Sequence, residues 1–541
     1  MDPDKKAELR DATIKESDAA KITQKNQSDV LKLDMARSFI TDPLLSRVVK
    51  AVKEDNAPDT KFDIIISLNE SFLGGVAAAS REVCKRADQW GRLKYRELPP
   101  YLFACLTAQQ ILELAREARE LTRLHGRSGS VIYRIWEDQD ISTTLTRSLT
   151  TVKADAAHRA FEAFGEGIVW AVLDSGIQGN HPHFTETQPH FQQGDAMLPL
   201  LHLDFTPAGR QSDSPEGPQH HDPSALQDNF GHGTHVAGII AGCWKSKNPN
   251  GQYVIGTEVH DEMSDKGIPQ RTDLLKCISG VAPKTRLISL KVIADQDLDN
   301  PKQVAGQGKV SWVLMAIDQI QKWNQYGKHL LIHGANLSLG YEFNPRWFAC
   351  GKSPLCVEVD RLVRSGVVAV VSAGNGGYSL HAQSNGQWQA GYNNLSITDP
   401  GNADLAITVG STHREKPHLY GVSYFSSSRG PTGDGRLKPD LIAPGERIIS
   451  CAAGKEKDKY SGKDADGKPL EDVLYCELSG TSMAAAHVSG AVAAFLSVRQ
   501  EYIGEPAQVK QILIDNAIDM RRERSFQGAG LLDLMKVLQS V

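Results

Sequence analysis

The sequence ELSGTSMAAAHVSGAVAAF, residues 477–495, decides the architecture of this chain. A Gly-Thr-Ser turn leads directly into a long run of small and apolar residues, which predicts a helix buried on all sides. Ser482 would lie in the first turn of that helix, where backbone N–H groups have no partner and the helix dipole favours negative charge. Such a serine is either an ordinary helix cap or a nucleophile whose oxyanion is stabilised where it forms.

Two further segments supply the groups that a nucleophilic serine needs. An apolar run, GIVWAVL, ends at Asp174, as expected for a buried strand of a parallel sheet whose carboxyl end carries a ligand site; a plain strand cap is the alternative. His232 lies between glycines in NFGHGTHVAG, which leaves its ring uncrowded before a second small-residue helix. His232 and His235 are potential zinc ligands, but HExxH is absent, so we expect no metal there.

A third apolar run, GVVAVV at 366–371, is followed by the glycine-rich turn SAGNGG. Asn375 in this turn can donate an amide N–H to an oxyanion, or it can be a plain turn residue. Asp174, His232 and Ser482 follow one another in the order of the subtilisin triad.

Several motifs together resemble those of subtilisin-like serine proteases (subtilases). AVLDSGI, GHGTHVAG, NLSLG, SAGN, SYFSSSRGP, KPDLIAPG and GTSMAAAHVSG occur in that family's order from about residue 151 to the end of the chain. One departure is Ala486, where the family usually has proline before the histidine; the loss of that ring removes a backbone restraint near Ser482.

The resemblance implies an α/β catalytic domain over 153–541, with a mostly parallel central sheet and helices on both faces. It implies a catalytic triad of Asp174, His232 and Ser482, with Asn375 in the oxyanion hole. It also implies a substrate site in two parts: a strand edge that pairs with substrate backbone, and a primary pocket. The strand edge is Ser338, Leu339 and Gly340, and the pocket is lined by Ala373 and Gly374.

Residues 59–140 predict a separate small α+β domain. Strand-like runs at 62–68, 101–106 and 131–136 alternate with two helical segments, the second capped by Thr107, which suggests helices on one face of an antiparallel sheet. The pattern also resembles the ferredoxin-like inhibitory prodomain of subtilases; an unrelated accessory domain is the alternative. Residues 1–58 read as a helical extension, and the Ser/Thr-rich 141–152 as an exposed linker where processing would occur.

Composition narrows the function. The 541 residues are 40% hydrophobic with a net charge of −5, so neither nucleic acid nor a membrane is an implied partner. The charged N-terminus lacks a signal sequence and no stretch reads as a membrane span, so we expect a cytoplasmic protein. The eight cysteines are expected as free thiols; bridges between Cys350 and Cys356 or between Cys451 and Cys476 are the alternative.

Four insertions between the motifs are expected as surface loops around the active-site rim: 185–227, 244–276, 341–358 and 454–471. His220, His221 and Asp222 in the first are either a metal site or, as we favour, a solvated loop. No organic cofactor is expected. Structural calcium is common in the family, but its ligands cannot be assigned from this sequence.

The sequence therefore favours a serine endopeptidase that hydrolyses peptide bonds through an acyl-enzyme on Ser482. Its partners would be protein or peptide substrates and its own N-terminal domain, acting as an intramolecular inhibitor in a precursor. Two alternatives stay open: a binding or scaffold protein on the same fold, and a switched signalling protease in which residues 1–58 sense a partner.

Overall fold

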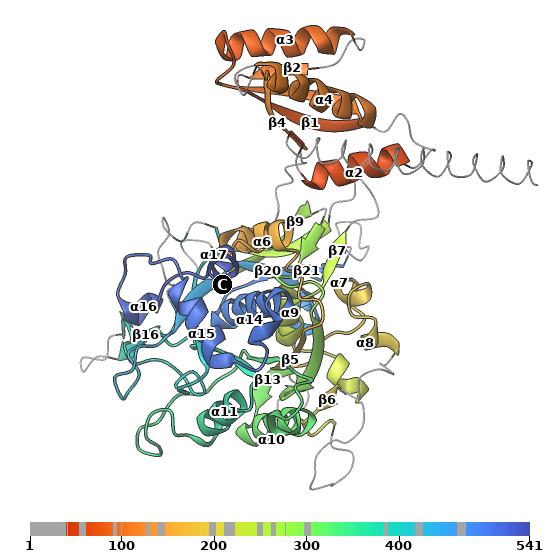
Figure 1. Cartoon of the computed structure of the whole chain (residues 1–541). Coiled ribbons are helices and arrows are strands. Elements are labelled where there is room, and N and C mark those ends of the chain that lie inside the picture. Colours follow the sequence, from red (N-terminus) through yellow and green to blue (C-terminus); the bar gives the residue numbers. More distant parts are fainter. Residues whose placement is uncertain are drawn as a thin grey trace, which may run out of the picture. The chain divides into compact units, whose positions relative to one another are not determined.

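A computed structural model divides the chain into two compact units, residues 1–141 and 142–541 (Figure 1). It describes residues 39–40, 42–53, 61–89, 95–98, 100–125, 130–137, 147–193, 202–209, 222–245, 253–260, 267–275, 277–296, 304–382, 388–415, 417, 426–461 and 472–541. Each unit has its own hydrophobic core.

The first unit is an antiparallel sheet packed against helices. Along the chain its strands are β1 (Lys61–Leu68), β2 (Tyr95–Leu98), β3 (Tyr101–Thr107) and β4 (Ile132–Glu137), and in the sheet they lie in the order β2-β3-β1-β4. Helix α3 (Gly75–Gln89) follows β1, and helix α4 (Ala108–His125) follows β3. Residues of β1 alternate between buried and more exposed, as a sheet with one covered face requires. The predicted cap at Thr107 is confirmed: its N–H donates to Gln110 Oε1 at 2.9 Å, and its hydroxyl accepts from Gln110 N–H at 3.4 Å.

The boundary expected at residue 58 is not where the first unit begins. Ile40 forms a bridge with Ile135 of β4, and helix α2 (Asp42–Lys53) buries Leu44, Leu45 and Val48 in the same core as the sheet. Helix α2 is thus part of this unit, because its apolar residues are buried in the core of the sheet. The rest of the expected extension, residues 1–38, lies outside the described residues.

The second unit is built on a seven-stranded parallel sheet. In the order β19-β18-β15-β14-β5-β11-β6, the strands are Leu441–Glu446, Ile407–His413, Val368–Ser372, Gly334–Leu337, Val169–Asp174, Arg286–Lys291 and Leu203–Asp204. Alternate residues of β5 enter different cores: Trp170 and Val172 join one, and Ala171 and Leu173 the other. The sheet is therefore buried on both faces, which confirms the predicted α/β fold with a parallel sheet.

Helices cover the two faces of this sheet (Figure 1). Buried residues of α9 and α14 join the core on one face, and those of α10 and α11 join the core on the other. The helices of the unit are α5 (Arg147–Thr151), α6 (Ala154–Phe161), α7 (Pro182–Thr185), α8 (His190–Gln193), α9 (His232–Ile240), α10 (Val310–Trp323), α11 (Pro354–Arg364), α13 (Gly454–Asp458), α14 (Thr481–Val498), α15 (Pro506–Asp515), α16 (Arg524–Gln527) and α17 (Leu534–Gln539), with 3-10 turns η2 (Pro223–Leu226), η3 (Gln325–Gly327) and η4 (Gln500–Tyr502).

Helix α14 is long and apolar enough to cross a membrane, but 89% of it is buried inside the unit. It contacts strands β14, β15, β18 and β19 as well as helix α9. It is the central core helix that its sequence predicts.

Two expected loops are ordered elements of the second unit. Within the expected linker, α5 places Leu149 in the core, and the backbone carbonyl of Val152 accepts a hydrogen bond from Leu534 N–H at 3.0 Å. The insertion 244–276 forms a hairpin of β8 (Tyr253–His260) and β9 (Gly267–Leu275). Residues 147–152 therefore depart from the expected linker, whereas 141–146 lie outside the described residues. The strand β8 pairs with the adjacent β9 and also with β21, which lies far away along the chain.

The β8–β9 hairpin extends a second sheet, in the order β20-β21-β8-β9, in which β20 is Ile448–Cys451 and β21 is Tyr475–Leu478. The remaining strands form three two-stranded ladders. They are β7 (Cys243–Lys245) with β10 (Cys277–Ser279), β12 (Ile293–Gln296) with β13 (Val304–Gly308), and β16 (Tyr378–Ala382) with β17 (Trp388–Tyr392).

Candidate active site

Three neighbouring strands and two helices bring the predicted site residues to one edge of the parallel sheet. Asp174 ends β5, Ser338 follows β14, and Asn375 follows β15, and these strands are adjacent in the sheet. His232 is the first residue of α9, and Ser482 lies in the first turn of α14. The carboxyl edge of the sheet thus gathers side chains spread over three hundred residues.

The glycines beside His232 are required by the turn. Gly231 has a φ of 96°, in the left-handed region that favours glycine. A Cβ on Gly233 would lie 2.2 Å from the backbone oxygen of Gly176, so only glycine allows α9 to start this close to the end of β5.

Asp174 and His232 are in direct contact. His232 Nδ1 lies 2.8 Å from Asp174 Oδ1, and the carboxylate is fully buried while the imidazole is about one-fifth exposed. Burial lowers the pKa of His232, but the charge and hydrogen bond of Asp174, with smaller contributions from Asp228 and Glu456, outweigh it and leave that pKa raised. The contact fixes the proton on Nδ1, so Nε2 is the free base.

Ser482 is held by a reciprocal pair of hydrogen bonds with Ser338. The Ser482 hydroxyl donates to the Ser338 carbonyl at 3.2 Å, and the Ser338 hydroxyl donates to the Ser482 carbonyl at 3.0 Å. Behind them, Asn336 Nδ2 donates to Ser338 Oγ at 2.8 Å, and Ser489 Oγ donates to Asn336 Oδ1 at 2.9 Å. These hydrogen bonds link Ser482, Ser338, Asn336 and Ser489, and they fix α14 on the end of β14. In this state His232 Nε2 makes no hydrogen bond with any described residue.

Asn375 is oriented by Thr481. Its Oδ1 accepts from the Thr481 N–H at 3.0 Å and from the Thr481 hydroxyl at 3.1 Å. That hydroxyl in turn accepts from Gly374 N–H at 3.1 Å. Asn375 is exposed, so its amide nitrogen remains able to donate to a group in front of α14.

Thr398 fills the space between the two segments expected to bind substrate. A Cβ on Gly340 would lie 2.8 Å from Thr398 Oγ1, and a Cβ on Gly374 would lie 2.6 Å from the same atom. The hydroxyl donates to the Ala373 carbonyl at 3.3 Å. Sequence reasoning missed Thr398, because nothing in its local sequence signals that it lies between two glycines remote along the chain.

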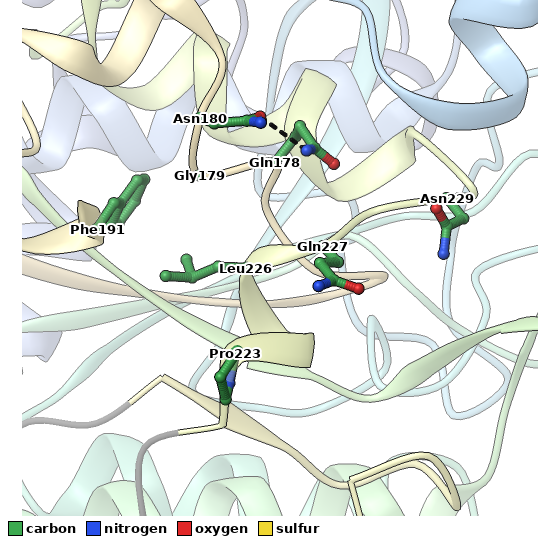
Figure 2. Close-up of a pocket in the computed structure, with 8 residues that line it drawn as sticks. All are labelled: Gln178, Gly179, Asn180, Phe191, Pro223, Leu226, Gln227 and Asn229. Carbon is green, nitrogen blue, oxygen red and sulfur yellow. Dashed lines mark hydrogen bonds between the residues drawn. The ribbon is translucent and has the colours of Figure 1, made fainter.

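A cavity of about 440 Å³ lies between the segment that follows Asp174 and the segment that precedes His232. Figure 2 shows its lining: residues 178–180, Phe191, Pro223, Leu226, Gln227 and Asn229. Gln178 donates to Asn180 Oδ1 at 2.8 Å across one side. The lining contains four carboxamide side chains and no charged side chain, so it can form hydrogen bonds with a ligand but carries no net charge.

The residues weighed for a metal have other partners. His235 Nε2 lies 3.1 Å from each of two backbone carbonyls, those of Ile448 and Cys476, and burial lowers the pKa of His235 to about 3. Asp222 caps η2, and residues 220–221 are outside the described part. Among the described residues, no group of three or more His, Cys, Asp or Glu side chains is arranged to hold a metal ion.

The alternative of disulfide bridges is wrong, because none of the eight cysteines is in a disulfide. Cys451 pairs with Tyr475 across β20 and β21 and packs with it in the large core. Cys476 is the next residue of β21, so its side chain points to the opposite face of the sheet, where it packs with Ala452 and Val473. Strand alternation thus separates the two thiols.

Comparison with known proteins places the chain in a family. The model of the Subtilase family matches residues 165–531. The chain is 28% identical over 312 residues to serine protease AprX of Bacillus subtilis (strain 168), covering 57% of each protein, so it spans little more than half of that relative. It is 26% identical over 410 residues to an intracellular serine protease of Paenibacillus polymyxa, covering 75% of this chain and 90% of the relative, and 26% identical over 391 residues to subtilisin E of Bacillus subtilis, covering 72% and 70%. The protein therefore belongs to the subtilase family of serine proteases.

Proposed function

We propose that this protein is a serine endopeptidase that hydrolyses peptide bonds through an acyl-enzyme on Ser482. The observation that carries the proposal is the 2.8 Å contact between Asp174 and His232 at the sheet edge where α14 presents Ser482. His232 Nε2 takes the hydroxyl proton, and Asp174 holds the tautomer and stabilises the imidazolium. Base catalysis of this kind accelerates a reaction by about 10²- to 10⁴-fold. The chemistry needs no organic cofactor.

Substrate binding prepares the nucleophile. At rest the Ser482 hydroxyl donates to the Ser338 carbonyl, whereas attack requires it to donate to His232. An extended substrate that pairs with Ser338, Leu339 and Gly340 places a backbone N–H on that carbonyl. The hydroxyl is then displaced and turns to the free imidazole nitrogen, so the base engages when a peptide is present.

The tetrahedral oxyanion is stabilised by the Asn375 amide and the Ser482 backbone N–H. Thr481 holds the Asn375 oxygen, so the amide nitrogen is oriented before the reaction begins. One such donor is worth about 2.7 to 4 kcal/mol of transition-state stabilisation.

The primary pocket, between Ala373, Gly374 and Gly340, accepts a small uncharged side chain before the cut. The Thr398 hydroxyl occupies the space between the two glycines, which makes the pocket shallow. A charged side chain would find no counter-charge on these residues.

The first unit is a ferredoxin-like prodomain that inhibits the second unit or assists its folding. In support, the elements after α2 follow the order βαββαβ, and on the face of β1 turned away from the core that the described helices join, Ile65 is only half-buried. Ile65 is paired by register with Phe103 of β3 and Trp136 of β4, so it lies at the middle of this sheet. Removal requires a cut between the units. Intact mass of the purified enzyme tests this, and full-length protein at full activity would contradict it.

A cytoplasmic location is part of the proposal, supported by relatives named intracellular serine proteases. Cell fractionation with an antibody against the chain tests it, and recovery from the medium would contradict it.

A fluorophosphonate probe tests the catalytic role of Ser482. It should label the wild-type protein stoichiometrically and leave Ser482→Ala unlabelled, with Ser489→Ala as the control for a second buried serine of α14. A folded wild-type protein that neither reacts with the probe nor cleaves denatured casein would support a scaffold protein instead.

A further inference from the structure

Asp228 is a buried carboxylate beside the Asp174–His232 pair that the proposed chemistry does not use. It is fully buried and accepts four hydrogen bonds. Oδ1 accepts from Ser175 Oγ at 2.8 Å and from Gly231 N–H at 2.7 Å, and Oδ2 accepts from the Thr234 N–H at 2.8 Å and the Thr234 hydroxyl at 2.6 Å. A buried charge of this kind is retained only when its hydrogen bonds are complete.

These hydrogen bonds connect the two halves of the catalytic pair. Ser175 directly follows Asp174, whereas Gly231 and Thr234 flank His232 at the start of α9. Ser175 Oγ also accepts from Gly233 N–H at 2.9 Å, so the strand end and the helix start share one network. Any shift of α9 relative to β5 would break several of these bonds together.

Lys291 holds the segment that contains Asp228 from the other side. The Lys291 ammonium is buried and donates to the Gln227 carbonyl at 2.8 Å and to Asp295 at 2.6 Å. Asp295 accepts from Asn229 N–H at 3.2 Å. Gln227 and Asn229 lie on the lining of the cavity in Figure 2, and the segment between them carries Asp228. Gln227 and Asn229, on either side of Asp228, are therefore held in place by hydrogen bonds.

We propose that Asp228 is a positioning residue of the active site, which sets the orientation of His232 against Asp174 and adds a second fixed negative charge behind the imidazole. This inference rests on the proposed peptidase function. It assigns to a carboxylate outside the triad both a geometric and an electrostatic role.

The electrostatic role has a defined sign. The groups acting on His232 are the carboxylates Asp174, Asp228 and Glu456, and the neighbouring His235, which burial keeps neutral with a pKa of about 3. The charge of Asp228 adds to the raised pKa of His232. Burial raises the pKa of Asp228 itself, and the hydrogen bonds it accepts offset this in part. Neutralising Asp228 therefore lowers the pH at which His232 becomes a free base.

Asp228→Asn keeps the size of the side chain and removes its charge. We expect kcat for an internally quenched peptide to fall about 10- to 100-fold with KM within about twofold, since misplacing a catalytic group acts on the chemical step. The acidic limb of the kcat/KM profile should move to lower pH by about 0.5 to 1 unit.

Thr234→Val is the matched control, because it removes a hydroxyl bonded to Asp228 and leaves the carboxyl group in place. It should lower kcat less, and its acidic limb should coincide with that of the wild type. A purely structural role for Asp228 predicts the same unmoved limb for both variants, and that result would overturn the electrostatic half of the proposal.

Wild-type kcat in a folded Asp228→Asn protein would overturn the whole proposal. Should this variant fail to fold, Ser175→Ala decides, since it breaks the bridge between Asp228 and Gly233 at a smaller perturbation. A kcat loss of about 3- to 10-fold with an unchanged melting temperature supports the proposal, and wild-type kcat refutes it. A wild-type protein that stays inactive after the chain has been cut between the units refutes the peptidase function itself, whereas an active wild type with unaffected variants refutes only the role of Asp228.

Discussion

Mild acid should destabilise the second unit strongly, because burial depresses the pKa values of five of its buried histidines. They are His181, His183, His190, His235 and His487. Burial lowers their pKa values to about 4, 3, 4, 3 and 4 in that order. In the unfolded chain a histidine titrates near pH 6.5, so the folded protein binds fewer protons than the unfolded chain below that pH.

The magnitude follows from linkage. Because the pKa values of these histidines are depressed in the folded protein, they cost no free energy of unfolding above about pH 7. Below pH 6.5 the unfolded chain binds protons that the folded protein does not, so the free energy of unfolding falls as the pH falls toward 4. Each histidine costs about 1.4 kcal/mol for the first full pH unit below 6.5. A change from pH 7.5 to 5.5 thus removes about 7 kcal/mol from the five together, against a total of about 5 to 15 kcal/mol for a typical domain.

The assay is urea unfolding followed by tryptophan fluorescence, in full-length Ser482→Ala protein to prevent self-digestion. His190→Gln should shrink the difference in unfolding free energy between pH 7.5 and 5.5 by about 1.4 kcal/mol. His329→Gln, at an exposed position, should leave it unchanged. Equal urea midpoints at the two pH values, or an equal effect of the two substitutions, would refute the reasoning.

Three further outcomes are expected. Asn375→Ala should lower kcat about 10²- to 10³-fold with little change in KM, whereas Asn393→Ala, which loses a bond to the Gly376 carbonyl in the same turn, should have a far smaller effect; steady-state kinetics would contradict this if the two agreed. Thr398→Gly should deepen the pocket and raise kcat/KM for a large apolar residue over alanine before the cut by about 10- to 200-fold in a peptide library, and an unchanged preference would place the pocket elsewhere. Leu149→Ala should cost about 2 to 5 kcal/mol of unfolding free energy, since α5 is part of the core; a cost below 0.5 kcal/mol would return this segment to the linker.

The parallel sheet could be predicted from sequence because its strands are continuous apolar runs. GIVWAVL and GVVAVV are apolar throughout, which predicts strands buried on both faces. Asp174 and the turn that contains Asn375 follow these strands, and the carboxyl ends of parallel strands lie at the same edge of the sheet. The convergence of Asp174 and His232 was predicted, and the coordinates place the two in contact. Their roles in catalysis remain predictions.

What could not be predicted depends on neighbours remote in sequence. The segment YVIGTEVH is expected from sequence to lie in a surface loop, but as β8 it pairs with β9 in a hairpin and also with β21, more than two hundred residues later. Asp228 resembles a helix cap, and its link to Ser175 exists only after β5 and α9 meet. Leu149 is hidden among serines and threonines, where no periodicity marks it.

The pairing of β8 with β21 limits how far this protein can be shortened. Tyr475 and Cys476 lie opposite Ile255 and Gly256, and only a few residues further on the chain reaches Ser482. A trimmed enzyme without 246–276 would leave one side of β21 with bare amides and carbonyls just ahead of its nucleophile. The insertion therefore supports the strand that precedes Ser482, and a minimal catalytic core of this protein must keep it.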